Sequence, residues 1–120
     1  MLRARRVFNT LAIFAVGGSC LMLSACFVFG DISSQDARDL VQNGARLIDV
    51  RSAKEYAGGH IDGAQHIPLN ELAVQIASLG SRTIPTVVYC RSGYRSNKAA
   101  KLLRKAGFKQ VYNLGPQSRW

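Results

Sequence analysis

Carboxylates are scarce in this 120-residue chain, which has 16 Lys and Arg residues but only 7 Asp and Glu residues. Residues 81 to 120 have none, so the segments 1 to 30, 31 to 80 and 81 to 120 carry charges of +3, −3 and +9. A field of one sign attracts anions, such as small anionic substrates, lipid head groups or nucleic acid. Aromatic residues make up only 8%, and no nucleic-acid-reading motif occurs, so we expect no nucleic-acid partner.

Cysteine is rarer still, with three residues in the whole chain. Cys20 and Cys26 lie in an uncharged run from Val7 to Gly30, which leaves Cys90 alone in the remainder. An isolated cysteine excludes an intradomain disulfide and makes a poor metal site, so we expect no metal and no cofactor. Cys90 is therefore either an inert core residue or a nucleophile.

The overall composition excludes two broad classes of protein. With 48% apolar and 19% charged residues, the chain is neither disordered nor a multi-span membrane protein. Its length allows one domain. The roughly 90 residues after the apolar run can bury a core without help from disulfides or metals, so we expect a monomer.

The N-terminus has the pattern of an export signal. Met1 to Arg6 is basic, Val7 to Leu23 is apolar, and the segment ends in Leu23-Ser24-Ala25-Cys26. This ending resembles the lipobox of bacterial lipoproteins. The resemblance implies a signal peptide over residues 1–25, lipidation of Cys26, and a short linker over 26–31.

Two other interpretations of this segment stay open: an uncleaved transmembrane anchor, which would make a single-pass membrane protein, and a soluble secreted protein. Arg5-Arg6 also fits a fragment of a twin-arginine signal. All of these interpretations place the domain outside the cytoplasmic membrane. We expect an exported domain anchored on the outer side of that membrane by a lipid or a helix.

Residues 32 to 120 show helix and strand signals in alternation. Capping residues, apolar periodicity and terminal glycines predict helices near 34–43, 69–79 and 95–106. Short apolar runs predict strands at 47–50, 86–89 and 111–114, and a polar turn is expected around 54–56. In the last helix, Leu102 is expected to face inward. Strands separated by helices pair in parallel, so we predict an α/β fold with a central, mostly parallel sheet covered by helices on both faces.

Cys90 follows the clearest buried strand, and in such sheets ligands gather at the carboxyl ends of the strands. The loop Cys90-Arg91-Ser92-Gly93-Tyr94-Arg95 leads from this strand into a helix. Gly93 can adopt a positive φ that curls the loop, and the helix dipole directs its positive end toward the same point. Both effects favour a thiolate, so we predict a lowered pKa for Cys90 and a nucleophile at neutral pH. Arg91 and Arg95 are expected to attract an anionic substrate.

These segments together resemble the rhodanese, or sulfurtransferase, family in a single-domain form over residues 32–120. The matching segments are Leu47-Ile48-Asp49-Val50-Arg51, Gly59-His60-Ile61-Asp62-Gly63-Ala64 with Ile67-Pro68, Val87-Val88-Tyr89-Cys90-Arg91-Ser92-Gly93-Tyr94-Arg95-Ser96, and Asn113-Leu114-Gly115 through Trp120. The chain departs from the family pattern at Gly115-Pro116, where paired glycines are common.

The resemblance implies a three-layer α/β fold and transfer of a sulfane sulfur. A small anionic donor such as thiosulfate would give its outer sulfur to Cys90, and the persulfide would pass it to cyanide or a thiol. The loop residues Arg91 to Arg95 would bind the substrate, and Asp49 and Arg51 would support the site through an ion pair with each other or with the loop. The Gly-His-Ile segment implies a structural turn, so His60 is not expected to act as a catalytic base.

Two rival functions remain open at this point. Phosphatases and arsenate reductases resemble C(x)5R, whereas Cys90 and Arg95 have the shorter spacing C(x)4R, which favours sulfur transfer. A non-enzymatic persulfide carrier or binding module is the other alternative. A lost nucleophile would indicate such a module, and Cys90 is intact.

Overall fold

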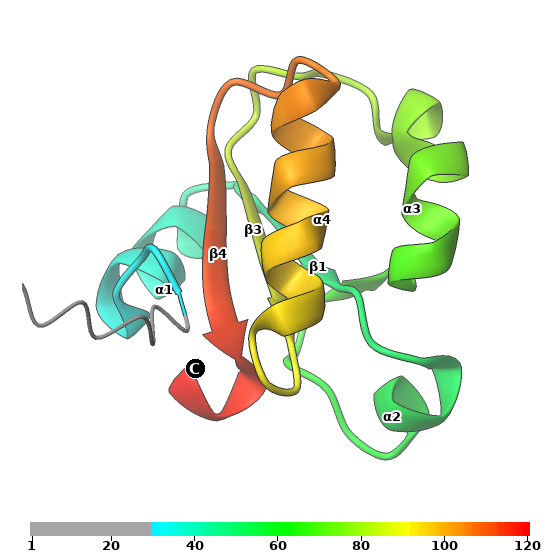
Figure 1. Cartoon of the computed structure of the whole chain (residues 1–120). Helices are drawn as coiled ribbons and strands as arrows, with labels where there is room; N and C mark the ends of the chain where they lie inside the picture. The colour runs from blue at the N-terminus through cyan, green and yellow to red at the C-terminus, as the bar shows by residue number, and fades with distance from the viewer. Residues whose placement is uncertain (1–29) are drawn as a thin grey trace, which may run out of the picture.

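The computed structural model describes residues 30–120, which form one four-stranded sheet with helices on both faces (Figure 1). The strands lie in the order β2-β1-β3-β4, and every pairing is parallel. The strands are β1 (Arg46–Asp49), β2 (Gln65–His66), β3 (Thr86–Cys90) and β4 (Val111–Pro116). The helices are α1 (Ser34–Gln42), α2 (Ala53–Ala57), α3 (Leu69–Gln75) and α4 (Tyr94–Lys105), and two short 3-10 turns are η1 (Ile76–Leu79) and η2 (Gln117–Arg119). The predicted three-layer α/β fold is confirmed.

Alternation along β3 divides the core into two parts, because successive side chains of a strand point to opposite faces. Val88 and Cys90 belong to the cluster under α3 and α4. Val87 and Tyr89 belong to the cluster that includes residues of α1. All of β3 is buried, so Cys90 lies at the end of the most protected strand.

Several element boundaries differ from the sequence-based expectation. The segment around 54–56 is the helix α2 rather than a turn, and the two-residue strand β2 was not predicted. The expected helix 69–79 is α-helical only to Gln75 and continues as the 3-10 turn η1. Leu102 does not face inward, because its side chain is 36% exposed.

Asp31 ties the start of the described chain to the last strand. Its backbone N–H donates to Asn113 O at 2.8 Å, and its carboxylate accepts from the Asn113 amide. The same carboxylate pairs with Arg104 of α4 at 2.6 Å. The first described residues are therefore bonded to both β4 and α4.

The predicted signal peptide or anchor over 1–25, with Cys20 and Cys26, lies outside the described residues, as does most of the predicted linker 26–31. Within residues 30–120, no helix combines the length and the apolar character needed to span a membrane.

Candidate active site

Cys90 is the last residue of β3, at the edge of the sheet where the carboxyl ends of the parallel strands meet. The chain turns sharply after it and enters α4, whose N-cap is Gly93. Gly93 has φ of +97°, the left-handed conformation that other L residues rarely adopt, as its position in the loop predicted. The chain therefore makes a tight turn between β3 and α4 (Figure 1).

The Cys90 sulfur is surrounded by hydrogen-bonding groups. The Gly93 N–H donates to Sγ at 2.9 Å, and Ser96 Oγ lies 3.3 Å from Sγ. Burial alone raises the pKa of the thiol, but hydrogen bonds from the Ser96 hydroxyl and from the amides of Ser96, Gly93 and Ser92 outweigh it. The pKa of Cys90 is consequently lowered, as predicted from the loop.

Cys90 is completely buried, yet polar groups surround its sulfur, as they would surround a buried anion rather than an inert core side chain. Ser96 is also fully buried, and its hydroxyl lies 3.1 Å from Gly93 O, so its single proton can be directed either to this oxygen or to Sγ. Arg91, Ser92 and Tyr94 are exposed on the outside of the loop. The sulfur is therefore enclosed, and the side chains of the loop that reach solvent are those on its outer surface.

Asp49 and Arg51 form the buried ion pair that the sequence had suggested as one local role. Arg51 Nη2 lies 2.6 Å from Asp49 Oδ2, and Nε donates to both carboxylate oxygens at 3.0 Å. Burial is the largest single influence and raises the pKa of Asp49, but the hydrogen bonds from Arg51 and Tyr89 and the charge of Arg51 together hold it below its usual value. Arg51 also donates to Gly59 O at 2.7 Å, so the pair fastens the loop that follows α2 to the end of β1.

Arg95 is engaged by a carboxylate that the sequence did not indicate. Its guanidinium binds both oxygens of Glu55 on α2, at 2.7 and 2.9 Å. This hydrogen-bonded pair lowers the pKa of Glu55 to about 2. The role expected for Arg95 in attracting a substrate stays a prediction, and its visible role is to join α2 to the start of α4.

Arg91 is placed differently, because it has no carboxylate partner among residues 30–120. It lines a polar hollow of about 480 Å³ together with Lys54, His60 and Gln117. Arg51 and Glu55, which are bound to Asp49 and Arg95, also contribute to this wall. Of the two arginines in the loop, Arg91 is thus the one whose charge is available to an incoming anion.

The two histidines support the turn between α2 and β2. His60 Nδ1 donates to Tyr56 O at 2.9 Å, and its ring stacks on Tyr56 with centroids 3.7 Å apart. His66 stacks on Tyr56 at 4.4 Å and donates from Nε2 to Arg51 O at 2.8 Å. The structural role expected for His60 is consistent with these contacts, and no motif had pointed to His66.

Ser96 and Glu55 are the site residues that sequence reasoning missed. Ser96 is three residues after Gly93, the N-cap of α4, so its hydroxyl lies in the first turn of that helix. This spacing is the sequence signal that could have identified Ser96 as a site residue. Glu55 is the N3 residue of a capping box with Ser52, which explains its helix but not its pairing with Arg95. In the part of the chain that the structure describes, no group of three or more His, Cys, Asp or Glu side chains is arranged to hold a metal.

Comparison with known protein families gives a match to the rhodanese-like domain over residues 33–115. Among curated proteins, the thiosulfate sulfurtransferase GlpE of Pseudomonas paraeruginosa is 38% identical over 72% of this chain and 77% of its own length. The uncharacterized protein YqhL of Bacillus subtilis is 43% identical, and the match covers 63% of this chain and 60% of that protein. This chain thus matches less than two thirds of the length of YqhL.

Solved structures agree with the fold. The human single-domain sulfurtransferase TSTD1 is 30% identical, with a TM-score of 0.65 over 74% of this chain and 89% of that chain. A rhodanese with anions from E. coli is 32% identical, with a TM-score of 0.61 over 64% of this chain and 92% of that chain. Both likenesses concern the domain that carries the cysteine loop.

Proposed function

Since the chain belongs to the rhodanese-like family, whose activity is sulfur transfer, we propose that it moves a sulfane sulfur from thiosulfate, or a similar small anion, to a thiol or cyanide through a persulfide on Cys90. The observation that carries the proposal is the set of donors at Sγ, with Gly93 N–H at 2.9 Å and Ser96 Oγ at 3.3 Å. These donors favour the thiolate, which is the reactive form.

In the first step, the Cys90 thiolate attacks the outer sulfur of thiosulfate. A bond forms between Sγ and this sulfur, the sulfur–sulfur bond of thiosulfate breaks, and sulfite leaves with the electron pair. The donor approaches as a dianion, and the unpaired Arg91 provides positive charge at the mouth of the loop. The loop amides then stabilise the negative charge of the persulfide.

In the second step, cyanide or a thiolate attacks the outer sulfur of the persulfide. The bond between the two sulfurs breaks, and its electron pair returns to Cys90 Sγ as the thiolate. Each step exchanges one sulfur bond for another, so the cycle needs no external oxidant, metal or organic cofactor.

A phosphatase or arsenate reductase function is less well supported. Oxyanion enzymes of that kind use the arginine at the end of the loop as a clamp. Here Arg95 holds Glu55 with two hydrogen bonds, so its guanidinium is already occupied by a carboxylate. The C(x)4R spacing points the same way.

The test uses the full chain, purified in detergent, with thiosulfate and cyanide. We expect thiocyanate to form, and intact-mass analysis after thiosulfate treatment to show one added sulfur atom on the protein. Cys90→Ser should abolish both signals, whereas Asn97→Ala, which changes an exposed side chain of α4 outside the loop, should retain them. Equal thiocyanate formation by the Cys90→Ser variant refutes the assigned nucleophile. A persulfide that forms but reacts with neither cyanide nor small thiols would instead identify a carrier.

We also propose that the domain is exported and held at the outer side of the cytoplasmic membrane by lipid on Cys26. The support is the sequence Leu23-Ser24-Ala25-Cys26 behind a basic and then apolar segment. In cells that process lipoproteins, Cys26→Ala should block lipid attachment and change the mass of the mature protein. An unchanged mass with unchanged membrane retention would point to a spanning helix.

A further inference from the structure

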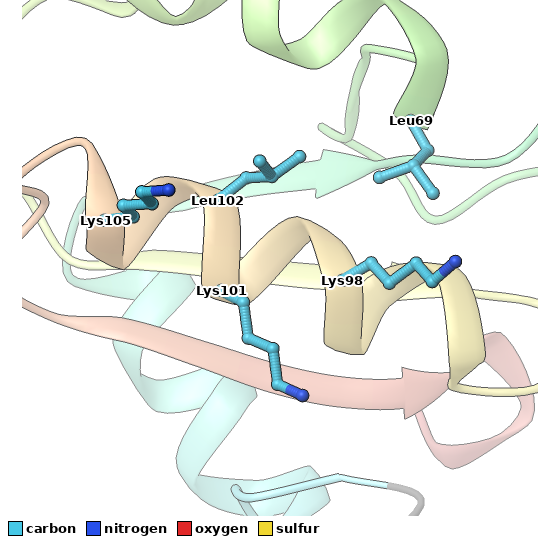
Figure 2. Close-up of a pocket in the computed structure, with 5 residues that line it drawn as sticks. All are labelled: Leu69, Lys98, Lys101, Leu102 and Lys105. Carbon is cyan, nitrogen blue, oxygen red and sulfur yellow. The ribbon is translucent and has the colours of Figure 1, made fainter.

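The surface between α3 and α4 combines apolar and basic side chains next to the Cys90 loop. A hollow of about 350 Å³ opens there, and its lining residues are Leu69, Lys98, Lys101, Leu102 and Lys105. Figure 2 shows Leu69 of α3 and Leu102 of α4 directed toward each other. Lys98 and Lys105 lie on either side of Leu102 along α4, and the Lys101 side chain extends from the opposite side of the helix. We call these five residues the α3–α4 surface.

The lysines of this surface differ from the arginines of the same helix. Arg95 and Arg104 are neutralised by Glu55 and Asp31. In contrast, Lys98, Lys101 and Lys105 are exposed and have no carboxylate partner within residues 30–120. The basic charge left on α4 is therefore concentrated around the hollow.

The centre of the surface is apolar. Leu102 is 36% exposed although its helical neighbour Leu103 is fully buried. An exposed leucine in a hollow framed by charges of one sign is suited to an apolar side chain flanked by charges of the opposite sign. A flat lipid surface would not fill a concave hollow in this way.

The surface is continuous with the cysteine loop. Leu69 also lines a second hollow of about 270 Å³, whose wall includes Arg95 of the loop. Lys98 Nζ lies 4.6 Å from the ring centre of Tyr94, which is 66% exposed and belongs to the same loop. At about 1.5 Å per residue, Leu102 is roughly 12 Å along α4 from Tyr94, a separation that one small protein contact can span.

We propose that the α3–α4 surface docks an acidic partner protein, which places an apolar side chain between Leu69 and Leu102 and carboxylates against Lys98, Lys101 and Lys105. The inference rests on the proposed function, because a macromolecular partner at this place is one that exchanges sulfur with Cys90. The partner's thiol would then lie beside the loop while its acidic segment is held by α4.

The probe is a fluorescein-labelled peptide of sequence Gly-Glu-Asp-Leu-Glu-Asp-Gly, and its binding to the full chain is followed by fluorescence anisotropy at low ionic strength. Two matched peptides are measured beside it: Gly-Gln-Asn-Leu-Gln-Asn-Gly, which lacks the charges, and Gly-Glu-Asp-Ser-Glu-Asp-Gly, which lacks the apolar side chain. We expect the acidic leucine peptide to bind at least about fivefold more tightly than either, because one control peptide lacks the exposed ion pairs and the other lacks the apolar contact.

Charge-reversed variants locate the site. Lys101→Glu with Lys105→Glu should remove the preference for the acidic over the neutral peptide, whereas Arg38→Glu with Lys109→Glu, which changes the net charge equally away from the hollow, should keep most of it. The readout is the ratio of the two affinities within each variant, so a general loss of active protein does not alter it. Leu102→Gln should remove the preference for leucine over serine in the peptide.

Three results would overturn the proposal. The first is equal binding of the acidic and neutral peptides, and the second is an equal loss of preference in the two double variants. The third is that Lys101 and Lys105 are needed for binding to detergent micelles that contain phosphatidylglycerol but not for binding to the peptides. The last result would assign the surface to lipid. Peptide binding does not require a sulfur on Cys90, so failure of thiosulfate turnover leaves this test intact, and failure here leaves the sulfurtransferase proposal intact.

Discussion

Removal of the Ser96 hydroxyl should make Cys90 harder to ionise. In Ser96→Ala, the Cys90 thiolate loses the donor that lies 3.3 Å from Sγ, while the Gly93 N–H at 2.9 Å remains. The thiol pKa should therefore rise toward the value that burial alone would favour.

The size of the effect follows from the two bonds that Ser96 makes. A hydrogen bond to a charged group contributes about 1.5–3 kcal/mol. The Ser96 hydroxyl has only one proton, however, and must give up its hydrogen bond to Gly93 O, 3.1 Å from Oγ, in order to donate to the thiolate. We therefore expect the lower end of this range, about 1.5 kcal/mol, or roughly a tenfold drop in the thiolate-to-thiol ratio at a given pH. Thiosulfate turnover below the thiol pKa should fall by a similar factor.

The assay is an ultraviolet titration of thiolate absorbance. Each protein is measured against its own Cys90→Ser counterpart, so that the signals of Cys20 and Cys26 cancel. Ser96→Thr, which keeps a hydroxyl, and Ser92→Ala, which removes an exposed one, are the controls. If Ser96→Ala titrates with the wild-type midpoint, or if Ser92→Ala shifts it equally, the hydroxyl of Ser96 does not stabilise the thiolate.

Three further predictions concern the charged residues around the loop. Glu55→Gln should lower the free energy of unfolding, measured in urea at neutral pH, by about 1–2 kcal/mol. The reason is that the pKa of Glu55 is depressed to about 2 in the folded protein. The stabilisation is therefore present above the pKa of Glu55 in the unfolded chain and is lost as the pH falls toward 2. Asp49→Asn should cost about 3 kcal/mol in the same assay, because it leaves the buried guanidinium of Arg51 without a counter-charge. Arg91→Ala should raise KM for thiosulfate by about tenfold with a smaller change in kcat, whereas Arg95→Ala should mainly destabilise the protein.

Each of these has an outcome that contradicts it. If Glu55→Gln and the wild type lose stability equally between pH 5 and pH 2, the Arg95 pair does not hold the carboxylate ionised. A loss below about 1 kcal/mol for Asp49→Asn would mean that Arg51 finds solvent or another acceptor. An unchanged KM in Arg91→Ala would remove that arginine from donor binding.

The cysteine loop could be predicted from the sequence because its determinants are local. The β-branched run before Cys90, the glycine at 93 and the apolar spacing of the following helix all lie within about twenty residues. They sufficed for the strand, the turn, the helix and the direction of the thiol pKa shift. The parallel sheet followed from the alternation of these elements.

Contacts between distant residues account for what was missed. α2 has only five residues, too few to show apolar periodicity, and the charge at its N3 position is bound by Arg95, 40 residues later. β2 has two residues and carries no strand pattern of its own. Leu102 has the spacing of a core residue, but the helix opposite it leaves a hollow. A local sequence pattern cannot predict these features, because each depends on which other helix or strand packs against the segment.

The hydrogen bonds and ion pair of Asp31 determine where a pulling force from the N-terminal side would act on the domain. A force pulling on the polypeptide ahead of residue 30 reaches Asp31 first and passes through its bonds to Asn113 and Arg104. These load the outer strand β4 and the C-terminal end of α4, whereas Cys90 ends the neighbouring inner strand β3. Tension from a tether at the N-terminus would therefore peel the sheet from its β4 edge, and the strand that holds the reactive sulfur would be released only after that edge had given way.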